Sequence, residues 1–591
     1  MLLALVLACA HPRPEPAAPG VPDPEAVRGV TDPTLRAVLA DQWESSLRRS
    51  PLGASRLGEH QYDALLDDIS ADAVAANRAA DAALLARVEA INAGALTTED
   101  STTVGLLLGE LRSGQATAVC HSEQWGLSAR NNPLITIGEL GELQPIVTQA
   151  DAANYLARVR ALPKYIDDDR AHLASGIAAG RTPDAGSVRI VLEQITTALA
   201  QPPTEWATMI PANTGHPDWP KGADATFRSD LLKILHDDVT RALAAYRSFL
   251  AVDLLPAARG EDRAGVWALP EGGACYAALI QAHTSLALPA ADLHATGLAE
   301  LRSIHAEMLV LGERLFGTKD IASLFTRLRG DPALRFTTAE EVEQKAVTAL
   351  AAAKARVPTF FGTLPKADCL VRRIPDYEAP YTTIAYYRQV VPGEQPGYYY
   401  INTYQPETRP RYEAEVLAFH ESIPGHHFQI AIGQELAEMP AFRKNLMTTA
   451  FVEGWALYTE RLADEMGLYS GDLDRLGMLS FDSWRASRLV VDTGIHAMKW
   501  TRADAESFML ANTPLAANNI KNEVDRYITW PGQALAYKTG QIAIRELRKE
   551  AEVAMGPKFS LAGFHDVVLG GGAVTLPVLQ QRVRAWIAAG V

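Results

Sequence analysis

The sequence predicts a mainly α-helical fold with one small antiparallel β-sheet, and two patterns support this prediction. Long stretches repeat apolar residues at helical spacing, as in ADAVAANRAADAALLARVEAINAG (71–94) and SDLLKILHDDVTRALAAYRSFLAVDLLP (229–256). Between residues 369 and 404 the texture changes to Val, Ile, Thr and Tyr, interrupted by Pro and Gly. Such runs favour short strands, and we expect them to form one small antiparallel sheet.

The helical pattern extends from about residue 31 to 255, and Thr338-Ala-Glu-Glu supplies an N-cap with acidic residues for a later helix. Three strands are expected in CLVRRIP (369–375), YTTIAYYRQV (381–390) and GYYYINTY (397–404). After Tyr404 the apolar spacing is helical again. Helices are expected at about 412–438, 441–466, 474–498, 503–509, 519–527 and 532–554.

Three regions follow from these patterns. Residues 1–32 are expected to be a signal and linker, and residues 33–260 an N-terminal helical lobe. Residues 261–591 are expected to hold the chemistry, with the sheet at about 369–404 and metal-binding helices at about 412–466. The two lobes are expected to form one continuous unit, and the sequence predicts no particular oligomeric state.

Composition narrows the class of partner. The 591 residues are 48% apolar and 21% charged, as in an ordinary soluble protein. A formal charge of −15 disfavours nucleic acid and anionic membrane surfaces as partners. Beyond the N-terminus no segment reaches the roughly 18 uninterrupted apolar residues of a transmembrane helix.

The first residues, MLLALVLACA, resemble a bacterial lipoprotein signal in which Cys9 is lipidated and becomes the new N-terminus. This predicts an exported periplasmic or cell-envelope lipoprotein that touches the membrane only through its lipid anchor. The alternative is an apolar start on a cytosolic protein.

Three further cysteines, Cys120, Cys275 and Cys369, are widely spaced. They allow at most one disulfide, and nothing in the sequence selects the pair. Because no C-x-x-C pair exists, any metal would be held by histidines and carboxylates.

The stretch VLAFHESIPGHHFQIAI (416–432) resembles the zinc motif H-E-x-x-H with altered spacing. In a continuous helix His426 lies roughly 240° around and ~9 Å along from His420, too far to share an ion. Pro424 and Gly425 disfavour a regular helix, so a bulge that takes up two residues would bring His426 beside His420. The alternative is a capped helix end with scattered histidines.

A third ligand is expected from Glu453, which stands among apolar residues 27 positions after His426. A carboxylate in such surroundings is costly unless it pairs with a cation or a metal. His420, His426 and Glu453 then form the His₂Glu set of one zinc ion. Pairing of Glu453 with an arginine, and His427 as the second ligand, remain open alternatives.

Four segments together resemble the bacterial domain of unknown function 885 family: HESIPGHH, FVEGWALYTE, RLVVDTGIHAMKWT and WPGQALAYKTGQ. The resemblance spans roughly residues 35–587. Members of that family are similar to helical zinc peptidases of the thimet oligopeptidase and angiotensin-converting-enzyme type. The resemblance implies a zincin-like fold, with the small sheet beside the active-site helix, and peptidase activity.

Catalytic roles can then be assigned. Glu421 follows the first ligand directly and is expected to be the general base for metal-activated water. Tyr537 is the first candidate for the oxyanion donor, since its segment is similar to one that supplies a tyrosine hydroxyl in thimet-type enzymes. His496 is the second candidate. Both could instead be core residues.

Substrate contacts are expected from polar residues near these motifs. His427 could be a substrate contact, and GYYYINTY is expected at the sheet edge, where an extended peptide would pair with it. The remaining candidates are Asn402, Tyr527, Arg488, Lys538 and Arg545. The predicted function is zinc-dependent hydrolysis of short peptides. Alternatives are a metal-dependent amidase for a non-peptide substrate and a non-catalytic surface-binding lipoprotein.

Overall fold

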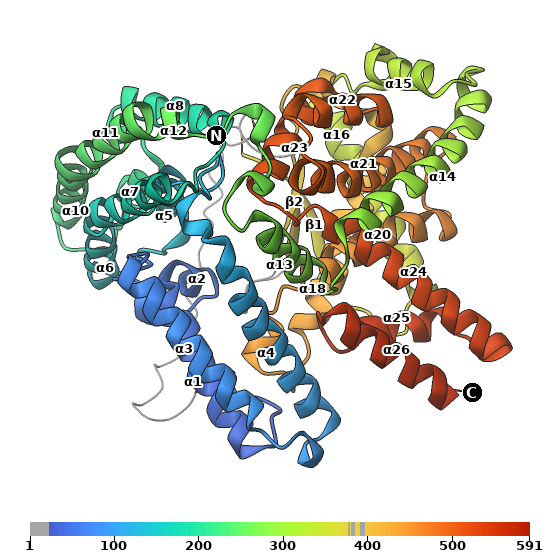
Figure 1. Cartoon of the computed structure of the whole chain (residues 1–591), viewed down its shortest axis with the longest axis horizontal. Coiled ribbons are helices and arrows are strands. Elements are labelled where there is room, and N and C mark those ends of the chain that lie inside the picture. The colour runs from blue at the N-terminus through green and yellow to red at the C-terminus, as the bar shows by residue number, and fades with distance from the viewer. Residues whose placement is uncertain (1–22, 376–378, 380–383, 390–395, 591) are drawn as a thin grey trace.

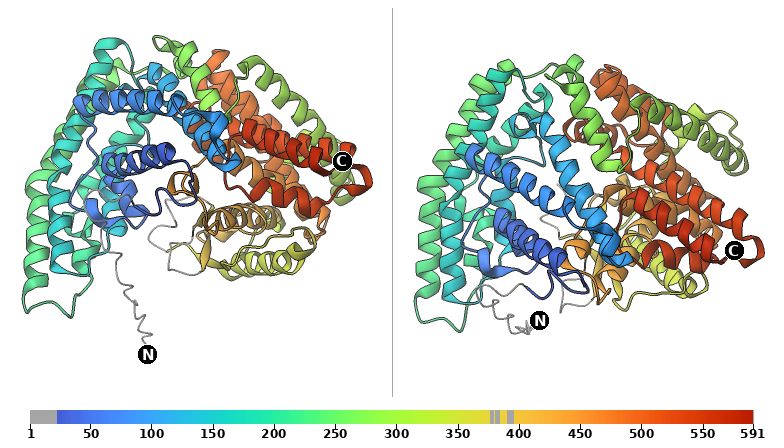
Figure 2. Two further views of the ribbon diagram at one scale, coloured as in Figure 1. Left: turned by 90° about the horizontal axis from the view of Figure 1, so that it is seen from below. Right: turned by 60° about the horizontal axis from the view of Figure 1, so that its bottom comes forward.

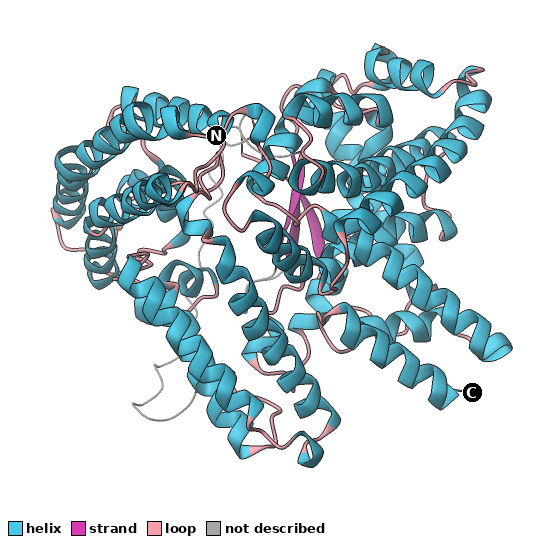
Figure 3. Ribbon diagram, viewed as in Figure 1, coloured by secondary structure: helices cyan, strands magenta, loops and turns pink. Residues whose placement is uncertain are grey.

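Helices make up most of the computed structural model, which describes residues 23–375, 379, 384–389 and 396–590 (Figures 1 and 3). Elements α1–α12 form one half of the molecule, and α13–α26 form the other together with the three strands (Figure 1). The mainly helical fold predicted from the sequence is confirmed. Cys9 lies outside the described residues.

The N-terminal half contains twelve α-helices, some of them short. They are α1 (Pro33–Arg49), α2 (Pro51–Arg56), α3 (Ala71–Glu89), α4 (Thr98–Thr117), α5 (Pro133–Leu143), α6 (Gln149–Arg160), α7 (Leu162–Ala179), α8 (Ala185–Ala200), α9 (Ile210–Asn213), α10 (Ala223–Ile234), α11 (Thr240–Phe249) and α12 (Leu255–Ala257).

The C-terminal half contains the strands and the longest helices. Its helices are α13 (Gly272–Thr284), α14 (Ala290–Phe316), α15 (Ile321–Gly330), α16 (Ala339–Arg356), α17 (Ala414–Glu421), α18 (His426–Gln434), α19 (Ala441–Lys444), α20 (Thr449–Glu465), α21 (Asp472–Ala497), α22 (Arg502–Asn512), α23 (Ala517–Thr529), α24 (Leu535–Met555), α25 (Leu561–Leu569) and α26 (Leu576–Gly590). The strands are β1 (Cys369–Arg373), β2 (Ala385–Arg388) and β3 (Gly397–Ile401).

Local signals in the sequence explain where several helices begin. Asp32 caps α1 by accepting from the Leu35 backbone N–H, and Pro33 occupies the first helical position. Thr338 caps α16 by accepting from the Glu341 N–H, as the sequence predicted. These caps satisfy backbone donors that have no partner within the helix.

The sheet is mixed, not antiparallel, with strand order β1-β3-β2. β3 pairs parallel with β1 and antiparallel with β2, so the predicted wholly antiparallel sheet is wrong. GYYYINTY supplies the central strand, so it cannot offer a free edge. β2 lies at one edge of the sheet, packed beside α17.

The two halves share an apolar core. One cluster contains buried residues of α1, α3 and α4 together with residues of α16, the sheet, α20 and α24–α26. A second core lies within the N-terminal half, and a third joins α14 and α15 to α21–α23. The views in Figure 2 show α1 and α4 lying against the C-terminal half. The C-terminal half is therefore packed on helices from the start of the chain.

Among the described residues, no helix is both long enough and apolar enough to cross a membrane.

A disulfide joins Cys120, just after α4, to Cys275 in α13, across 155 residues of sequence. Cys369 is a buried free thiol in β1. The bridge therefore links the two halves covalently.

We expect the paired substitution Cys120→Ser/Cys275→Ser to lower the free energy of unfolding by about 4 kcal/mol, because the open chain regains loop entropy. The midpoint of urea unfolding without reductant measures this. Wild-type protein in dithiothreitol should unfold like the variant, and the variant should be insensitive to dithiothreitol. Equal midpoints for variant and oxidised wild type would contradict a stabilising bridge.

Candidate metal centre

The histidine motif spans a break between two helices. α17 ends at Glu421 and α18 begins at His426, with a cis peptide bond at Ile423–Pro424 between them. The single helix expected at 412–438 is therefore wrong. The predicted bulge is a complete interruption, because the chain leaves the helical conformation at Ser422, with φ −110° and ψ −106°.

Gly425 allows the chain to turn back tightly at this break. A Cβ atom at this position would lie 1.9 Å from the carbonyl oxygen of His420 and 2.4 Å from that of Phe419. No side chain fits in that space, so glycine is required by close backbone contact. The contact places the start of α18 against the end of α17 and brings His426 beside His420.

His420, His426 and Glu453 converge on one point. The Nε2 atoms of His426 and His420 lie 3.4 Å and 3.8 Å from Glu453 Oε2. The two imidazole rings are nearly perpendicular, with centroids 4.7 Å apart. The potential ligand atoms all lie within 4.8 Å of one another. Tetrahedral ligands at ~2.1 Å from zinc are ~3.4 Å apart, so these residues fit a zinc ion with small adjustments.

Helix α20 carries Glu453, and a side-chain hydrogen bond from this helix holds it against the segment between α17 and α18. Trp455 Nε1 donates to the carbonyl of Pro424 at 3.0 Å. Oε2 of Glu453 is buried and has no hydrogen-bond partner of good geometry among the described residues. Burial raises the pKa of the Glu453 carboxyl, but its contacts with His426 and the Tyr537 hydroxyl outweigh burial and lower it overall.

Glu460 orients the first histidine. Its Oε1 lies 2.8 Å from His420 Nδ1, so Nε2 of that ring points towards Glu453. Burial raises the pKa of Glu460 to about 8. Such a carboxylate behind a histidine is typical of metal sites. Sequence reasoning missed Glu460, although its spacing of seven residues after Glu453 places both on one helix face.

Glu421 lies between the metal residues and the sheet. Its Oε2 accepts a hydrogen bond from the backbone N–H of Tyr387, in the edge strand β2, at 3.1 Å. Burial raises the pKa of Glu421 to about 7, with a smaller opposing effect of His426. The carboxyl group can therefore both accept and donate a proton near neutral pH.

Tyr537 lies beside Glu453 because α20 and α24 pack very closely. A Cβ at Gly454 would lie 2.5 Å from Gly540, and one at Gly540 only 1.8 Å from the Ala450 carbonyl oxygen. The Tyr537 hydroxyl hydrogen-bonds the Glu453 carboxyl and accepts from Arg526 at 3.0 Å.

The structure does not bring His427 or His496 to this point. His427 is fully buried, with Nδ1 at 3.1 Å from the Tyr387 hydroxyl and Nε2 at 3.1 Å from the Ala367 carbonyl oxygen. Nδ1 of His496 accepts from Val266 N–H, and Nε2 lies 2.9 Å from the Tyr527 carbonyl oxygen. Both ring nitrogens of each histidine are engaged, so neither is available here as a ligand, a substrate contact or an oxyanion donor.

Three other candidates are engaged in buried networks. Arg488 donates to the Tyr527 hydroxyl at 3.0 Å and to Glu523 at 2.9 Å, and that hydroxyl in turn donates to Glu523 at 2.7 Å. Lys538 is fully buried and donates to Asp482 at 2.5 Å. These side chains have protein partners where substrate contacts were expected.

Asn402 and Arg545 also lie elsewhere. Asn402 is buried, and its side-chain amide donates to the Ala379 carbonyl at 2.7 Å. Arg545 is exposed on α24, where it lines a charged surface groove with Arg548 and Glu552.

Arg485, a buried side chain on α21, is a residue that sequence reasoning missed. It is 4% exposed, stacks on Trp484, and its Nε and Nη1 have no hydrogen-bond partner among the described residues. Its nearest carboxylate is Glu460, at 3.9 Å. Burial raises the pKa of Glu421 and lowers that of His420. The positive charge of Arg485 opposes the first effect and adds to the second, so it acts electrostatically on the centre.

Comparisons with known proteins identify the family but no activity. No curated protein matches the sequence. The fold is similar to that of a candidate lipoprotein from Colwellia psychrerythraea, with 25% identity and a TM-score of 0.87 over 94% of this chain and 98% of that one. A candidate lipoprotein of unknown function from Shewanella oneidensis matches with 19% identity and a TM-score of 0.73, over 93% and 98% of the respective chains.

A profile match assigns the chain to a family, and the zincin-like character of the fold stays a prediction. The profile of a family described as bacterial protein of unknown function (DUF885) matches residues 51–583. Because that match covers most of the chain, the protein belongs to the DUF885 family.

Proposed function

We propose that this protein is a zinc-dependent hydrolase that cleaves short peptides. The observation that carries the proposal is the convergence of His420, His426 and Glu453, with Glu421 directly beside the first of them. This is the ligand set of His₂Glu zinc hydrolases together with a carboxyl group placed as a base.

The metal would be held by His420 Nε2, His426 Nε2 and Glu453 Oε2. Zinc, when bound, supplies Lewis acidity and makes water nucleophilic near neutral pH. Glu460 holds the His420 ring in the tautomer that presents Nε2 to the ion.

Glu421 would accept the proton of the attacking water and pass it to the leaving amine. Burial favours the neutral form of this carboxyl group, which helps it to hold the proton between the two transfers. The Arg485 guanidinium contributes a fixed positive charge, which favours the negative charge that develops on the carbonyl oxygen. The Tyr537 hydroxyl, next to Glu453, is the remaining candidate donor for that oxygen.

The edge strand β2 offers a place for a peptide backbone. Extended peptides bind by adding a strand to a sheet edge, and β2 is such an edge directly beside Glu421. This role, predicted for GYYYINTY, therefore passes to β2.

Two observations support an exported location. The resemblance of residues 1–10 to a lipoprotein signal agrees with the description of both structural relatives as candidate lipoproteins. The disulfide between Cys120 and Cys275 is typical of an oxidising compartment. We propose a cell-envelope lipoprotein anchored through Cys9.

Zinc content measured by plasma mass spectrometry tests the ligand set. We expect about one zinc ion per wild-type chain, and less than about a tenth of that in His426→Ala and Glu453→Ala, because each loses one of three protein ligands. Glu465→Ala, an exposed glutamate on the same helix α20, is the matched control and should keep its zinc. Zinc retained in His426→Ala, or absent from reconstituted wild type, would contradict the site.

Glu421→Gln separates metal binding from catalysis. The amide cannot take a proton, so we expect kcat on a short peptide to fall by about 1000-fold or more while zinc content stays at the wild-type level. Hydrolysis of a quenched fluorescent peptide library gives the rates. Unchanged turnover in Glu421→Gln would remove this residue from the reaction.

Glu460→Gln tests the orienting carboxylate. We expect zinc affinity, measured by competition with a chelator, to weaken by about 10- to 100-fold. Glu465→Gln controls for a charge change on the same helix and should bind zinc like wild type. Equal affinities in Glu460→Gln and wild type would show that the His420–Glu460 contact does not support the metal.

A further inference from the structure

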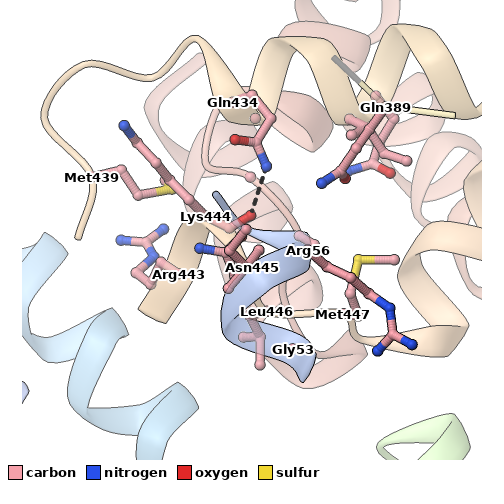
Figure 4. A pocket seen from close by; sticks show the side chains of 16 residues that line it. Gly53, Arg56, Gln389, Gln434, Met439, Arg443, Lys444, Asn445, Leu446 and Met447 are labelled. Carbon is pink, nitrogen blue, oxygen red and sulfur yellow. Dashed lines mark hydrogen bonds between the residues drawn. The ribbon is translucent and has the colours of Figure 1, made fainter. Parts of the chain in front are cut away.

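A cavity of about 380 Å³ lies between α2, α18 and the segment 439–447 (Figure 4). Its volume is in the range of sites that hold a small ligand or a large side chain. Gln389, directly after β2, completes one wall. None of the residues assigned above to metal binding or catalysis lines it.

Helix α18, which carries His426, and strand β2, which contacts Glu421, both continue into this cavity. Gln429 and Ile430 line it, and they follow His426 by three and four residues on the same side of α18. Gln389 lies two residues beyond Tyr387, whose N–H donates to Glu421, which corresponds to ~7 Å along an extended chain. A peptide paired with β2 would therefore place a neighbouring side chain at this cavity.

The cavity is cationic in a protein with a net charge of −15. Arg56, Arg443 and Lys444 line it, and no Asp or Glu does among the described residues. Each of these cations pairs with an exposed carboxylate outside the lining: Arg56 with Glu139, Arg443 with Glu99 and Lys444 with Glu25. A ligand with a negative charge is therefore favoured.

Two buried polar atoms of lining residues lack partners. Oε1 of Gln429 and Nε of Arg443 have no hydrogen bond among the described residues, although the two side chains are only 4% and 3% exposed. The first is an acceptor and the second a charged donor. An acidic residue of a peptide could satisfy both atoms. Its carboxylate would accept from Arg443 Nε, and its main-chain N–H would donate to Gln429 Oε1.

Apolar side chains form the rest of the wall, including Leu57, Ile430, Met439 and Leu446. They suit the methylene stem of a glutamate, and methionine adapts to such a stem. Figure 4 shows Arg56 and Lys444 on the same cavity as Met439 and Leu446.

We propose that this cavity is a side-chain subsite that selects an acidic residue, with glutamate preferred, close to the bond cut at the metal centre. The subsite rests on the proposed peptidase function for its effect on turnover, but its affinity for acidic peptides can be measured without turnover.

The test uses zinc-loaded full-length protein and peptides that differ only by glutamate or glutamine at each successive position. We expect kcat/KM to favour glutamate by about tenfold at one position. Arg56→Gln/Lys444→Gln should reduce that preference, measured as the ratio of kcat/KM for the glutamate and glutamine peptides, to about twofold. Lys233→Gln/Arg241→Gln removes two exposed cations of α10 and α11 and should keep the full preference.

A second readout separates failure of the subsite from failure of the peptidase function. The same peptides, now carrying a fluorescent label, are titrated with the Glu421→Gln variant of the protein, and fluorescence anisotropy gives their affinities. Glutamate-dependent binding that Arg56→Gln/Lys444→Gln abolishes supports the subsite even if wild type cleaves no peptide. Equal affinity and equal cleavage for glutamate and glutamine peptides at every position, absence of binding, or a preference that survives the double substitution would overturn it.

Discussion

The backbone contact at Gly425 is the constraint on which the candidate centre depends. The carbonyl oxygens of Phe419 and His420 occupy the space where a Cβ atom would stand, so α18 can start directly against the end of α17. A continuous helix would carry the second histidine ~9 Å away along its axis. Trp455 then binds the Pro424 carbonyl in the break and fixes α20 against it. Backbone contacts, together with the Trp455 side chain, therefore position the three candidate ligands.

Electrostatics favour a cation at the point where these helices meet. Glu421 and Glu460 are buried enough to raise their pKa values to about 7 and about 8. Glu460 is paired with His420 Nδ1 at 2.8 Å, whereas the buried Oε2 of Glu453 has no hydrogen-bond partner among the described residues. A buried, unpaired carboxylate costs several kcal/mol. The protein thus concentrates carboxyl groups around two imidazoles that face Glu453. A divalent ion at this point would offset that cost, which is the physical reason for preferring metal binding to a purely structural ion cluster.

Features of the fold that depend on local sequence were predictable, and those that depend on distant partners were not. The cap of α16 at Thr338 and the presence of three strands follow from neighbouring residues. The order of the strands does not follow from neighbouring residues, because the aromatic and β-branched composition of GYYYINTY suits a central strand as well as an edge strand. Pro424 and Gly425 predict an interruption of the helix after Glu421. The conformation of the interruption was not predictable, because it depends on the contact of Gly425 with the end of α17 and on the hydrogen bond from Trp455 in α20 to the Pro424 carbonyl.

The same distinction explains which candidate site residues the structure brings together. Residue type suggests that His496, Lys538 and Arg488 could bind a substrate. It cannot show that each already forms a hydrogen bond within the protein, with Val266, Asp482 and Glu523 respectively. Glu453 was predictable because an apolar stretch of α20 offers a carboxylate no local partner. A polar group that is buried at a cost, and that no neighbour satisfies, is available to a ligand. By that criterion Glu453 Oε2 marks the candidate metal centre, since it is buried, has no hydrogen-bond partner among the described residues and faces the Nε2 atoms of His420 and His426.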